Sequence, residues 1–520
     1  MQPKTSLEET KDHPIVGVVS TETSNSKPNS VFGRIKAVLS SVASNDELRG
    51  RIFRGGAWMG MGSVSEQSFR FLRNMILARL LAPSAFGTMA IVMSTNALLQ
   101  AFSEIGVREA LIQNPRGTEP EYVNTAWWMS FCRSLFVYAT LFAAAPYVAR
   151  FYADPQLTRL LRVAISCLVL EGAMSSRSYI AMKQMKFRLW AMIQHGGGII
   201  GVATTLVLGF FIRNVWALVI GTCTESAARF VLSFVICPFL PSIRIDRVAL
   251  KDLLRFSRGL FGLAPLFIVF MRTDVFVLGK LISATALGYY SMGIAVAQVP
   301  AGFIANLLGQ LFMPAMAHVQ DDKARMRRIV LQVSAVIVLV FMPAIVFAYF
   351  CGGPFLRLVY GPSYAVAVTS LILASCGVLI TLLNNPITTA FYATGAPELH
   401  RRCIVAMAVT MAALTYPLAK WLGPAGAQVA SLISISAGVV AQFPLATRLM
   451  NVRASDYGKI FIHGTATSAV VTAFCLLARF APHANRPVVT VGLGALACLL
   501  AYAGMALLFL RNRKLVHDYS

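Results

Sequence analysis

The strongest constraint on this sequence is the recurrence of apolar stretches that are long enough to cross a lipid bilayer. A membrane-spanning helix needs roughly 20 consecutive, mostly apolar residues. With that window, the 520-residue chain contains about fourteen such stretches, separated by short polar segments. We therefore predict an all-α, polytopic membrane protein with about fourteen transmembrane helices. The predicted spans lie near residues 57–80, 86–112, 124–148, 160–182, 189–212, 215–238, 259–281, 287–317, 329–351, 364–392, 403–421, 424–447, 460–479 and 488–510.

Charged residues are scarce and unevenly distributed. They make up 13% of the chain, whereas a soluble protein carries roughly a quarter, so lipid must replace water around most of the surface. The formal net charge of +24 is also a feature of nucleic-acid-binding proteins. Here, however, most Lys and Arg residues lie in short loops. With a cytoplasmic N-terminus they favour the cytoplasmic loops by about three to one. The bias predicts that both termini are cytoplasmic and that nucleic acid is not a partner.

Composition also bears on cofactors and on the N-terminal segment. The nine cysteines include no CxxC pair and the seven histidines have no HExxH spacing, so we expect no metal site, no cofactor and no catalytic residues. Within residues 1–44, the stretch Thr21–Ser30 is polar and rich in Ser and Thr, and the segment lacks an apolar region followed by a cleavage site. This pattern predicts a disordered cytoplasmic tail without a signal peptide.

Two pairs of similar segments indicate an internal repeat. Arg51-Ile-Phe-Arg54-Gly55 resembles Arg255-Phe-Ser-Arg258-Gly259, and Leu80-Leu-Ala-Pro-Ser-Ala-Phe-Gly87 resembles Leu281-Ile-Ser-Ala-Thr-Ala-Leu-Gly288. Six predicted spans separate the copies, so both halves have the same orientation, as in parallel repeats related by an axis along the membrane normal. The repeat predicts two pseudo-symmetric six-helix lobes, whose first helices should face each other across a cavity.

The repeat also sets the predicted domain boundaries. Residues 45–240 would form the N-terminal lobe and residues 259–450 the C-terminal lobe. Between them, residues 241–258 would be a cytoplasmic linker in which Asp246 caps a short basic surface helix. Residues 451–520 would supply two additional helices and the cytoplasmic C-terminus.

Charged residues within predicted spans are the candidate site residues. Glu66, Arg70 and Arg73 recur at helical spacing on one face of the first span. Facing lipid, three such charges would cost roughly 8–10 kcal/mol, so they must face protein or a wet cavity. The seventh span carries Arg272 and Asp274. These side chains could simply pair, Glu66 with Arg70 and Arg272 with Asp274. Alternatively, the arginines could bind an anionic group with their planar forks.

Five further charged residues lie in predicted spans, and four of them, Arg133, Arg229, Glu104 and Glu225, are secondary candidates. Arg229 follows Glu225 by four residues, which favours a structural ion pair. Arg133 lies in the third span. For the acid Glu104, and also for Glu171, a satisfied hydrogen bond or a helix-end position is favoured over ion coupling.

Several longer strings resemble one known family. The chain resembles the oligosaccharide flippases of lipopolysaccharide and exopolysaccharide biosynthesis, which belong to the multidrug/oligosaccharidyl-lipid/polysaccharide exporter superfamily. The order and spacing of the matching strings agree with this family over residues 50–330, and a weaker similarity continues toward the C-terminus. The strings are Leu80-Leu-Ala-Pro-Ser-Ala-Phe-Gly-Thr-Met-Ala90, Ala110-Leu-Ile-Gln113, Asn124-Thr-Ala-Trp-Trp128, Phe151-Tyr-Ala-Asp-Pro155, Val215-Trp-Ala-Leu-Val219, Lys280-Leu-Ile-Ser-Ala-Thr-Ala-Leu-Gly-Tyr-Tyr290 and Met313-Pro-Ala-Met-Ala-His-Val-Gln-Asp-Asp322.

The resemblance implies a non-enzymatic transporter of the bacterial inner membrane. Such proteins flip an undecaprenyl-pyrophosphate-linked oligosaccharide from the cytoplasmic to the periplasmic leaflet by alternating access. The first two helices of each lobe would line the cavity. The implied partners are the lipid-linked oligosaccharide, membrane lipid, and the polysaccharide polymerase and export machinery.

Two other functions remain open on the sequence. A drug or cation antiporter of the same superfamily would favour acids in the N-terminal lobe, whereas the first span here is dominated by arginines. A membrane enzyme of glycan assembly would need a sizeable aqueous domain. All predicted periplasmic loops are short, and no DxD pair marks a nucleotide-sugar metal site.

Overall fold

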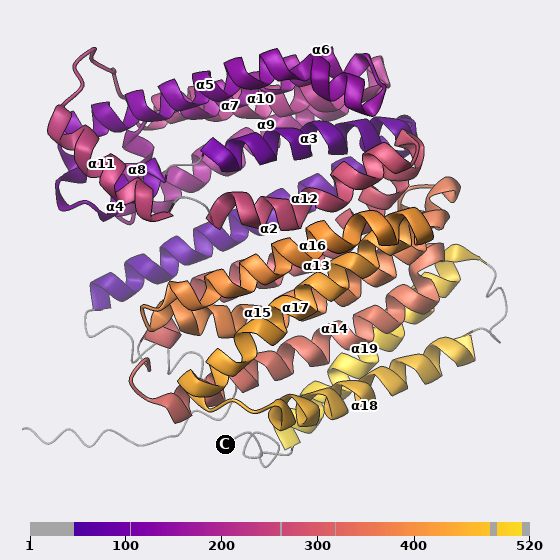
Figure 1. The fold of residues 1–520 in the computed structure, drawn as a ribbon. Helices are drawn as coiled ribbons and strands as arrows, with labels where there is room; N and C mark the ends of the chain where they lie inside the picture. Colours follow the sequence, from indigo (N-terminus) through magenta and orange to yellow (C-terminus); the bar gives the residue numbers. More distant parts are fainter. Residues whose placement is uncertain (1–45, 104–105, 261–262, 318, 479–485, 512–520) are drawn as a thin grey trace, which may run out of the picture. The chain divides into compact units, whose positions relative to one another are not determined.

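A computed structural model describes residues 46–103, 106–260, 263–317, 319–478 and 486–511 (Figure 1). The predicted tail, residues 1–44, lies outside this part of the chain. The described residues form helices joined by short turns, with no strand among them. The predicted all-α, polytopic architecture is therefore confirmed.

The N-terminal half runs from α2 to α10, and α11 connects it to the second half (Figure 1). Its elements are α2 (Asp46–Leu80), α3 (Pro83–Ser103), α4 (Val107–Gln113), the 3₁₀ helix η1 (Pro115–Thr118), α5 (Pro120–Tyr152), α6 (Gln156–Ala164), α7 (Ser166–Gly172), α8 (Arg177–Lys183), α9 (Phe187–Ile212), α10 (Val215–Ile236) and α11 (Arg247–Leu260).

The C-terminal half contains longer, mostly unbroken helices. Its elements are α12 (Leu263–Leu281), α13 (Ala284–Ala317), α14 (Lys323–Val359), the 3₁₀ helix η2 (Pro362–Ala367), α15 (Val368–Ala393), α16 (Pro397–Leu422), α17 (Pro424–Met450), α18 (Ala454–Ala478) and α19 (Pro487–Arg511).

Helix length and composition support most of the predicted spans. In the described residues, 11 helices are long and apolar enough to cross a membrane. Helices α2 and α12 are not among them, although each occupies a predicted span. Both carry several charged residues within the helix, among them Glu66, Arg70 and Arg73 in α2 and Arg272, Asp274 and Lys280 in α12. The total of fourteen therefore remains a prediction.

One predicted span is wrong in its details. Residues 160–182 do not form a continuous helix but contribute to three short ones, α6, α7 and α8. The chain breaks between α7 and α8 because α10 satisfies the polar groups there. The backbone N–H of Ser175 donates to Ser233 Oγ (3.0 Å), and Ser175 Oγ donates to the carbonyl of Cys237 (2.7 Å). A buried backbone break is tolerated in a membrane protein when neighbouring helices bind its polar groups.

The second predicted span, 86–112, is also interrupted. Helix α3 ends at Ser103 and α4 begins at Val107, after Gly106 adopts the left-handed conformation at φ 61°. Glycine takes this conformation without the steric cost of a Cβ atom. The apolar composition of this stretch does not reveal the break.

The predicted cap of the linker helix is confirmed. Helix α11 begins at Arg247, and the backbone N–H of Ala249 donates to Asp246 Oδ1 (2.7 Å). Ala249 and Leu253 are buried against apolar residues of α4, α5 and α8. Tyr122 donates a hydrogen bond to Asp252 (2.7 Å), which fixes α11 to the start of α5.

The two halves meet through equivalent glycines of the repeat. A Cβ atom on Gly87 in α3 would lie 1.9 Å from the carbonyl oxygen of Ala284. A Cβ atom on Gly288 in α13 would lie 1.9 Å from the carbonyl oxygen of Pro83. Each glycine is the fifth residue of its helix, so the contact is symmetric. The absence of side chains at these two positions lets the backbones of α3 and α13 touch.

The first helix of each half packs beside the second helix of the other. Helix α2 contacts α13 and α9, whereas α12 contacts α3 and α16. At the α2–α13 contact, a Cβ atom on Gly302 would lie 3.2 Å from the side-chain nitrogen of Gln67. This crossed arrangement places the charged face of α2 close to both halves of the molecule.

Candidate functional site

The charged face of α2 begins a network of ionisable side chains within the N-terminal half. Arg70 donates to Glu66 Oε1 through Nε (3.0 Å) and Nη2 (2.8 Å). The two residues are four apart, which brings their side chains together on one helix face. The Glu66–Arg70 ion pair, which the sequence analysis considered as a purely structural role, is therefore present.

A second carboxylate reaches the same arginine from α10. Glu225 Oε1 lies 2.5 Å from Arg70 Nη2 and 2.6 Å from Arg229 Nη2, so it bridges the two cations. The Glu225–Arg229 pair was predicted from its i, i+4 spacing, and the link to Arg70 was not. Arg229 Nη2 also approaches Glu66 Oε1 at 3.7 Å, which closes a ring of alternating charges.

A histidine that the sequence analysis missed completes this network. His195 in α9 places Nδ1 2.6 Å from Glu66 Oε2. Glu66 thus binds Arg70 through one oxygen and His195 through the other. The signal that could have identified His195 is its position directly before Gly196-Gly-Gly198 in an otherwise apolar helix.

Small residues make room for these charged side chains. A Cβ atom on Gly197 would lie 2.3 Å from Arg229 Cγ, and one on Gly201 would lie 2.5 Å from Glu225 Cβ. On α2, a Cβ atom on Gly62 would lie 2.2 Å from the His195 ring. The glycines of α9 allow close helix packing, as expected from their position in a membrane helix. They also define the space that the network occupies.

The network is balanced in charge and unequally accessible. Two carboxylates face two guanidinium groups, so the four side chains sum to zero, and a protonated His195 would make the total positive. The side chain of Glu225 is 9% exposed and that of Arg229 is 18% exposed, whereas that of Arg70 is 30% exposed. Arg70 is therefore the cation that an incoming anion could reach most easily.

Arg73 lies outside the ring of ion pairs. It donates from Nε and Nη2 to the side-chain oxygen of Asn74, at 3.3 and 3.2 Å. Within the described residues it forms no salt bridge with a carboxylate.

The charged pair of the C-terminal half is arranged differently. Asp274 accepts a hydrogen bond from Tyr290 (2.6 Å), whose hydroxyl oxygen accepts one from Gln428 (2.8 Å). Arg272 Nε and Asp274 Oδ1 are buried without a hydrogen-bond partner among the described residues. Arg272 and Asp274, both in the described part of α12, attract each other electrostatically, but they form no salt bridge with each other. The reason is their i, i+2 spacing, which points the two side chains to different sides of the helix.

Two of the remaining candidates lie beside the ring of ion pairs. Glu171 on α7 interacts electrostatically with Arg229 and Glu225 of the ring and with Arg133 on α5. Glu104 lies outside the described residues. Glu171 accepts a hydrogen bond from Ser226 (3.2 Å), which agrees with the satisfied acid that the sequence suggested. The described residues contain no group of three or more His, Cys, Asp or Glu side chains that could hold a metal ion.

Comparison with known proteins identifies the family and several relatives of this chain. The profile of a family described as "Polysaccharide biosynthesis protein" matches residues 76–369. The lipopolysaccharide biosynthesis protein WzxC of Escherichia coli is 22% identical over 345 residues, covering 65% of this chain and 69% of WzxC. The succinoglycan biosynthesis transport protein ExoT of Rhizobium meliloti is 21% identical over 333 residues, covering 63% of this chain and 67% of ExoT.

Solved structures agree on the architecture. The lipid II flippase MurJ in an inward closed conformation matches with a TM-score of 0.71 at 12% identity, covering 86% of this chain and 98% of MurJ. A mutant form of the Vibrio cholerae MATE transporter VcmN matches with a TM-score of 0.53 at 12% identity, covering 81% of this chain and all of VcmN. At such identity the likeness concerns the fold alone. Since the family profile spans more than half of the sequence, the chain belongs to the family of polysaccharide biosynthesis proteins, membrane proteins built from many transmembrane helices.

Proposed function

We propose that this protein moves an anionic, lipid-linked oligosaccharide from the cytoplasmic to the periplasmic leaflet of the bacterial inner membrane. The observation that carries the proposal is the accessible Arg70 within a charged network in the membrane-spanning region of a polysaccharide biosynthesis protein. The relatives WzxC and ExoT, named for polysaccharide biosynthesis and transport, and the lipid II flippase MurJ support the same class of activity.

The proposed ligand group is the undecaprenyl pyrophosphate that links the sugar to the lipid. A guanidinium group can form two parallel hydrogen bonds with phosphate oxygens. In the structure the Arg70 donors contact the carboxylates of Glu66 and Glu225, so a phosphate would have to exchange with one of these groups. Arg73 and Arg272 would add positive charge to the cavity that the repeat predicts between the two lobes.

Each carboxylate keeps another contact during such an exchange. If Arg70 turns toward a phosphate, Glu66 still contacts His195 and Glu225 still contacts Arg229. No carboxylate is then left buried without a partner, which would cost several kcal/mol per charge. The arrangement therefore allows Arg70 to change partners at low cost.

The membrane potential would assist transport in this direction. Negative charge that moves outward across a membrane with a negative interior gains about 2.3 kcal/mol per elementary charge per 100 mV. The proposed cargo carries its negative charge on the pyrophosphate, so the sign of the charge agrees with the direction of export.

A drug or cation antiporter is the second candidate, and the acids Glu66 and Glu225 are the observation that favours it. The fold likeness to VcmN is compatible with that activity. However, both acids are already paired with arginines, which lowers their affinity for a cationic ligand. We therefore favour the anionic, lipid-linked substrate. A polymerase and an export complex are the proposed downstream partners.

Arginine substitutions test the proposal. Arg70→Ala should abolish most polysaccharide export and cause lipid-linked intermediate to accumulate, whereas Arg70→Lys should retain partial activity because it keeps the charge and loses the fork. Arg73→Ala should also impair export, with little loss of stability because no carboxylate in the described structure depends on it. Arg159→Ala is the matched control, since Arg159 is exposed on α6 and forms no ion pair in the described structure.

Protein abundance must be measured in the same cells. Each variant should accumulate in the membrane at the level of the unaltered protein. Wild-type export by Arg70→Ala at normal abundance would refute the proposed role of this network.

A further inference from the structure

Two cations join the halves of the protein at the end where α2, α5, α12 and α14 terminate. Arg79, in the last turn of α2, donates a hydrogen bond from Nη2 to the carbonyl of Leu358 in α14. Lys280, in the last turn of α12, donates from Nζ to the carbonyl of Phe151 in α5 (2.6 Å) and lies 5.1 Å from the centre of the Phe151 ring. Each cation thus reaches from the first helix of one half to a helix of the other half.

The two contacts are equivalent under the internal repeat. Arg79 and Lys280 directly precede the repeated segments that begin at Leu80 and Leu281. Their acceptors correspond as well. Around the ends of α5 and α14, the strings Arg150-Phe-Tyr-Ala-Asp-Pro155 and Arg357-Leu-Val-Tyr-Gly-Pro362 both begin with Arg and have Pro five residues later, and the acceptor is the second residue of each. One contact is therefore the symmetry mate of the other.

Both acceptors are carbonyls that a helix end leaves available. The last four carbonyls of an α-helix have no partner within the helix, and they lie at the negative end of the helix dipole. After α5, the backbone N–H of Ala153 binds the carbonyls of Ala149 and Arg150. After α14, the N–H of Tyr360 binds the two equivalent carbonyls. The next carbonyl along each helix accepts its bond from the cation of the other half, which is a favourable partner for a helix C-terminus.

Close packing between the halves accompanies these two bonds. The hydroxyl of Tyr152 donates to the carbonyl of Phe276 (3.3 Å), and a Cβ atom on Gly279 would lie 2.9 Å from the Tyr152 ring. Gly87 and Gly288, whose backbones contact the opposite half, lie near the starts of α3 and α13, directly after α2 and α12. The predicted topology places this end on the periplasmic side, so the structure has its two halves in contact there.

We propose that Arg79 and Lys280 form a reversible clasp that holds the predicted periplasmic end closed, and that both bonds break when the cavity opens to that side. The inference rests on the alternating access of the proposed function and does not depend on the substrate. Alternating access moves one repeat against the other, so contacts between the halves at either end must form and break. Both donors are exposed. Water can therefore replace each carbonyl on opening, and each bond favours the closed form only modestly.

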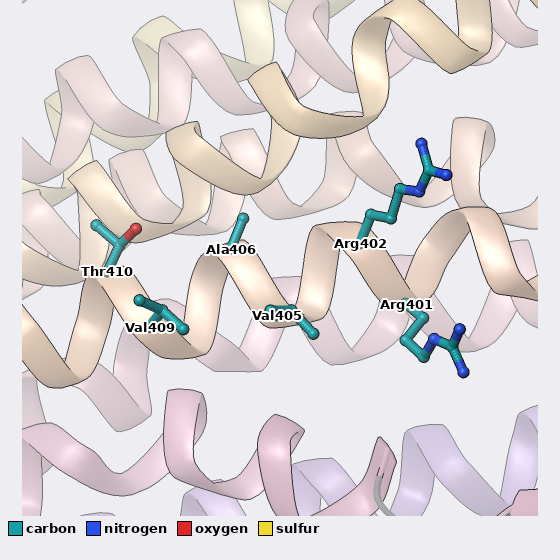
Figure 2. Close-up of a pocket in the computed structure, with 6 residues that line it drawn as sticks. All are labelled: Arg401, Arg402, Val405, Ala406, Val409 and Thr410. Carbon is teal, nitrogen blue, oxygen red and sulfur yellow. The ribbon is translucent and has the colours of Figure 1, made fainter.

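The competing explanation is that these cations are static helix caps. Static caps would stabilise the closed and open forms alike, so their removal would lower thermal stability without changing the separation of the halves. A basic residue near a helix end does not by itself mark a clasp. Figure 2 shows Arg401 and Arg402 near the start of α16 pointing to different sides of that helix, so these two cations do not converge on one partner.

Arg213 provides the matched control for the clasp. It is exposed, it lies in a loop that the predicted topology places in the periplasm, and it donates from Nε to the carbonyl of Phe210 at the end of its own helix (3.2 Å). The chemistry of this contact resembles that of the clasp, but donor and acceptor belong to the same half. Arg213→Ala should therefore leave the separation of the halves unchanged.

Pulsed electron paramagnetic resonance measures the distance across this end. Spin labels on unnatural amino acids at Gln156 and Ser363, which are exposed and equivalent in the repeat, leave the nine native cysteines unchanged. In the purified protein without substrate, Arg79→Ala and Lys280→Ala should each raise the ratio of open to closed distances about threefold, and together about tenfold. The symmetry of the clasp predicts equal effects for the two single variants.

Charge-keeping variants distinguish loss of the clasp from damage to the fold. Arg79→Lys and Lys280→Arg should keep a predominantly closed distribution, because each retains a cation that can donate to a helix-end carbonyl. A double alanine variant whose distances match those of the unaltered protein would overturn the proposal, even if its thermal midpoint falls. If that variant does not fold, the same comparison is made with the two single variants.

The Arg70→Ala variant separates the clasp from the proposed substrate site. Arg70 binds Glu66 and Glu225 within the N-terminal half, so this variant should keep the closed distances even though export fails. Shifted distances in the clasp variants together with normal export by Arg70→Ala would refute the central network and support the clasp. Unshifted distances together with failed export by Arg70→Ala would refute the clasp and support the network.

Discussion

Replacing Gly87 or Gly288 with alanine should weaken the contact that joins the two halves of this protein. In both cases the new methyl carbon would lie 1.9 Å from a backbone carbonyl oxygen of the facing helix. A backbone atom cannot rotate away as a flexible side chain can. Helices α3 and α13 must therefore separate to accommodate either substitution.

The magnitude follows from two opposing effects. Overpacking of a close contact costs about 1–3 kcal/mol, and a backbone clash belongs at the upper end of that range. Alanine recovers about 1 kcal/mol relative to glycine through its higher helix propensity. Each single substitution should thus destabilise the protein by about 2 kcal/mol.

The double variant gives the sharper test because the two contacts are reciprocal. Once the first methyl group has separated the helices, the second has less overlap to relieve. The double substitution should therefore cost less than the sum of the singles, with a coupling of about 1 kcal/mol or more. Thermal unfolding of the purified protein in one detergent measures all three variants on a common scale.

Gly458→Ala serves as the control for helix propensity. Nothing in the described structure lies within 4 Å of a Cβ atom built on Gly458 in α18, so alanine should stabilise the protein slightly there. The reasoning fails if Gly87→Ala and Gly288→Ala raise the unfolding temperature as the control does. It also fails if their effects add without coupling.

Three other predictions concern the network, the topology and the tail. Glu225→Gln should lower stability by about 3–5 kcal/mol, since it removes the shared counter-charge of Arg70 and Arg229, and an unchanged thermal midpoint would contradict this expectation. Reporter fusions at Asp321 should be cytoplasmic and those near Gly361 periplasmic, so detection of both on one side would rule out the predicted topology. Deletion of residues 2–44, which lie outside the described structure, should leave insertion and export largely intact. Normal insertion without export would reveal a role for the tail.

Helix positions were largely predictable because they depend on local composition. The predicted spans 189–212 and 215–238 correspond closely to α9 and α10. Between them, the side chain of Asn214 accepts a hydrogen bond from the backbone of Trp216, a local N-cap that fixes the start of α10. Signals of this kind are contained within a few residues of the sequence.

The break between α7 and α8 was not predictable, because it depends on tertiary contacts. Ser175 can leave the helical pattern since Ser233 and Cys237, about 60 positions later in the chain, bind its polar groups. In an apolar stretch such as 160–182, nothing local distinguishes a broken helix from a continuous one. The sequence therefore predicts the presence of a membrane-embedded segment better than its internal geometry.

The same distinction applies to the charged network. The Glu66–Arg70 and Glu225–Arg229 pairs follow from i, i+4 spacing within single helices. The contact between Arg70 and Glu225 joins residues 155 positions apart, and a lone histidine in an apolar helix gives no spacing signal. Only the packing of α2, α9 and α10 shows that these two ion pairs belong to one ring of alternating charges.

A neutralised network has a consequence for the proposed transport. Unpaired arginines in a membrane cavity would be costly to bury, and they would hold a diphosphate strongly enough to slow its release. In this protein an anion at Arg70 must compete with two carboxylates, which lowers its net affinity. The same carboxylates can return to Arg70 when the anion leaves, so release does not expose a bare charge. On the proposed function, Glu66 and Glu225 would therefore assist release of the substrate, whereas Arg70 would assist its capture. Removal of Glu66 should then slow release of the bound substrate even if capture remains normal, which single-turnover and multiple-turnover flipping measurements would distinguish.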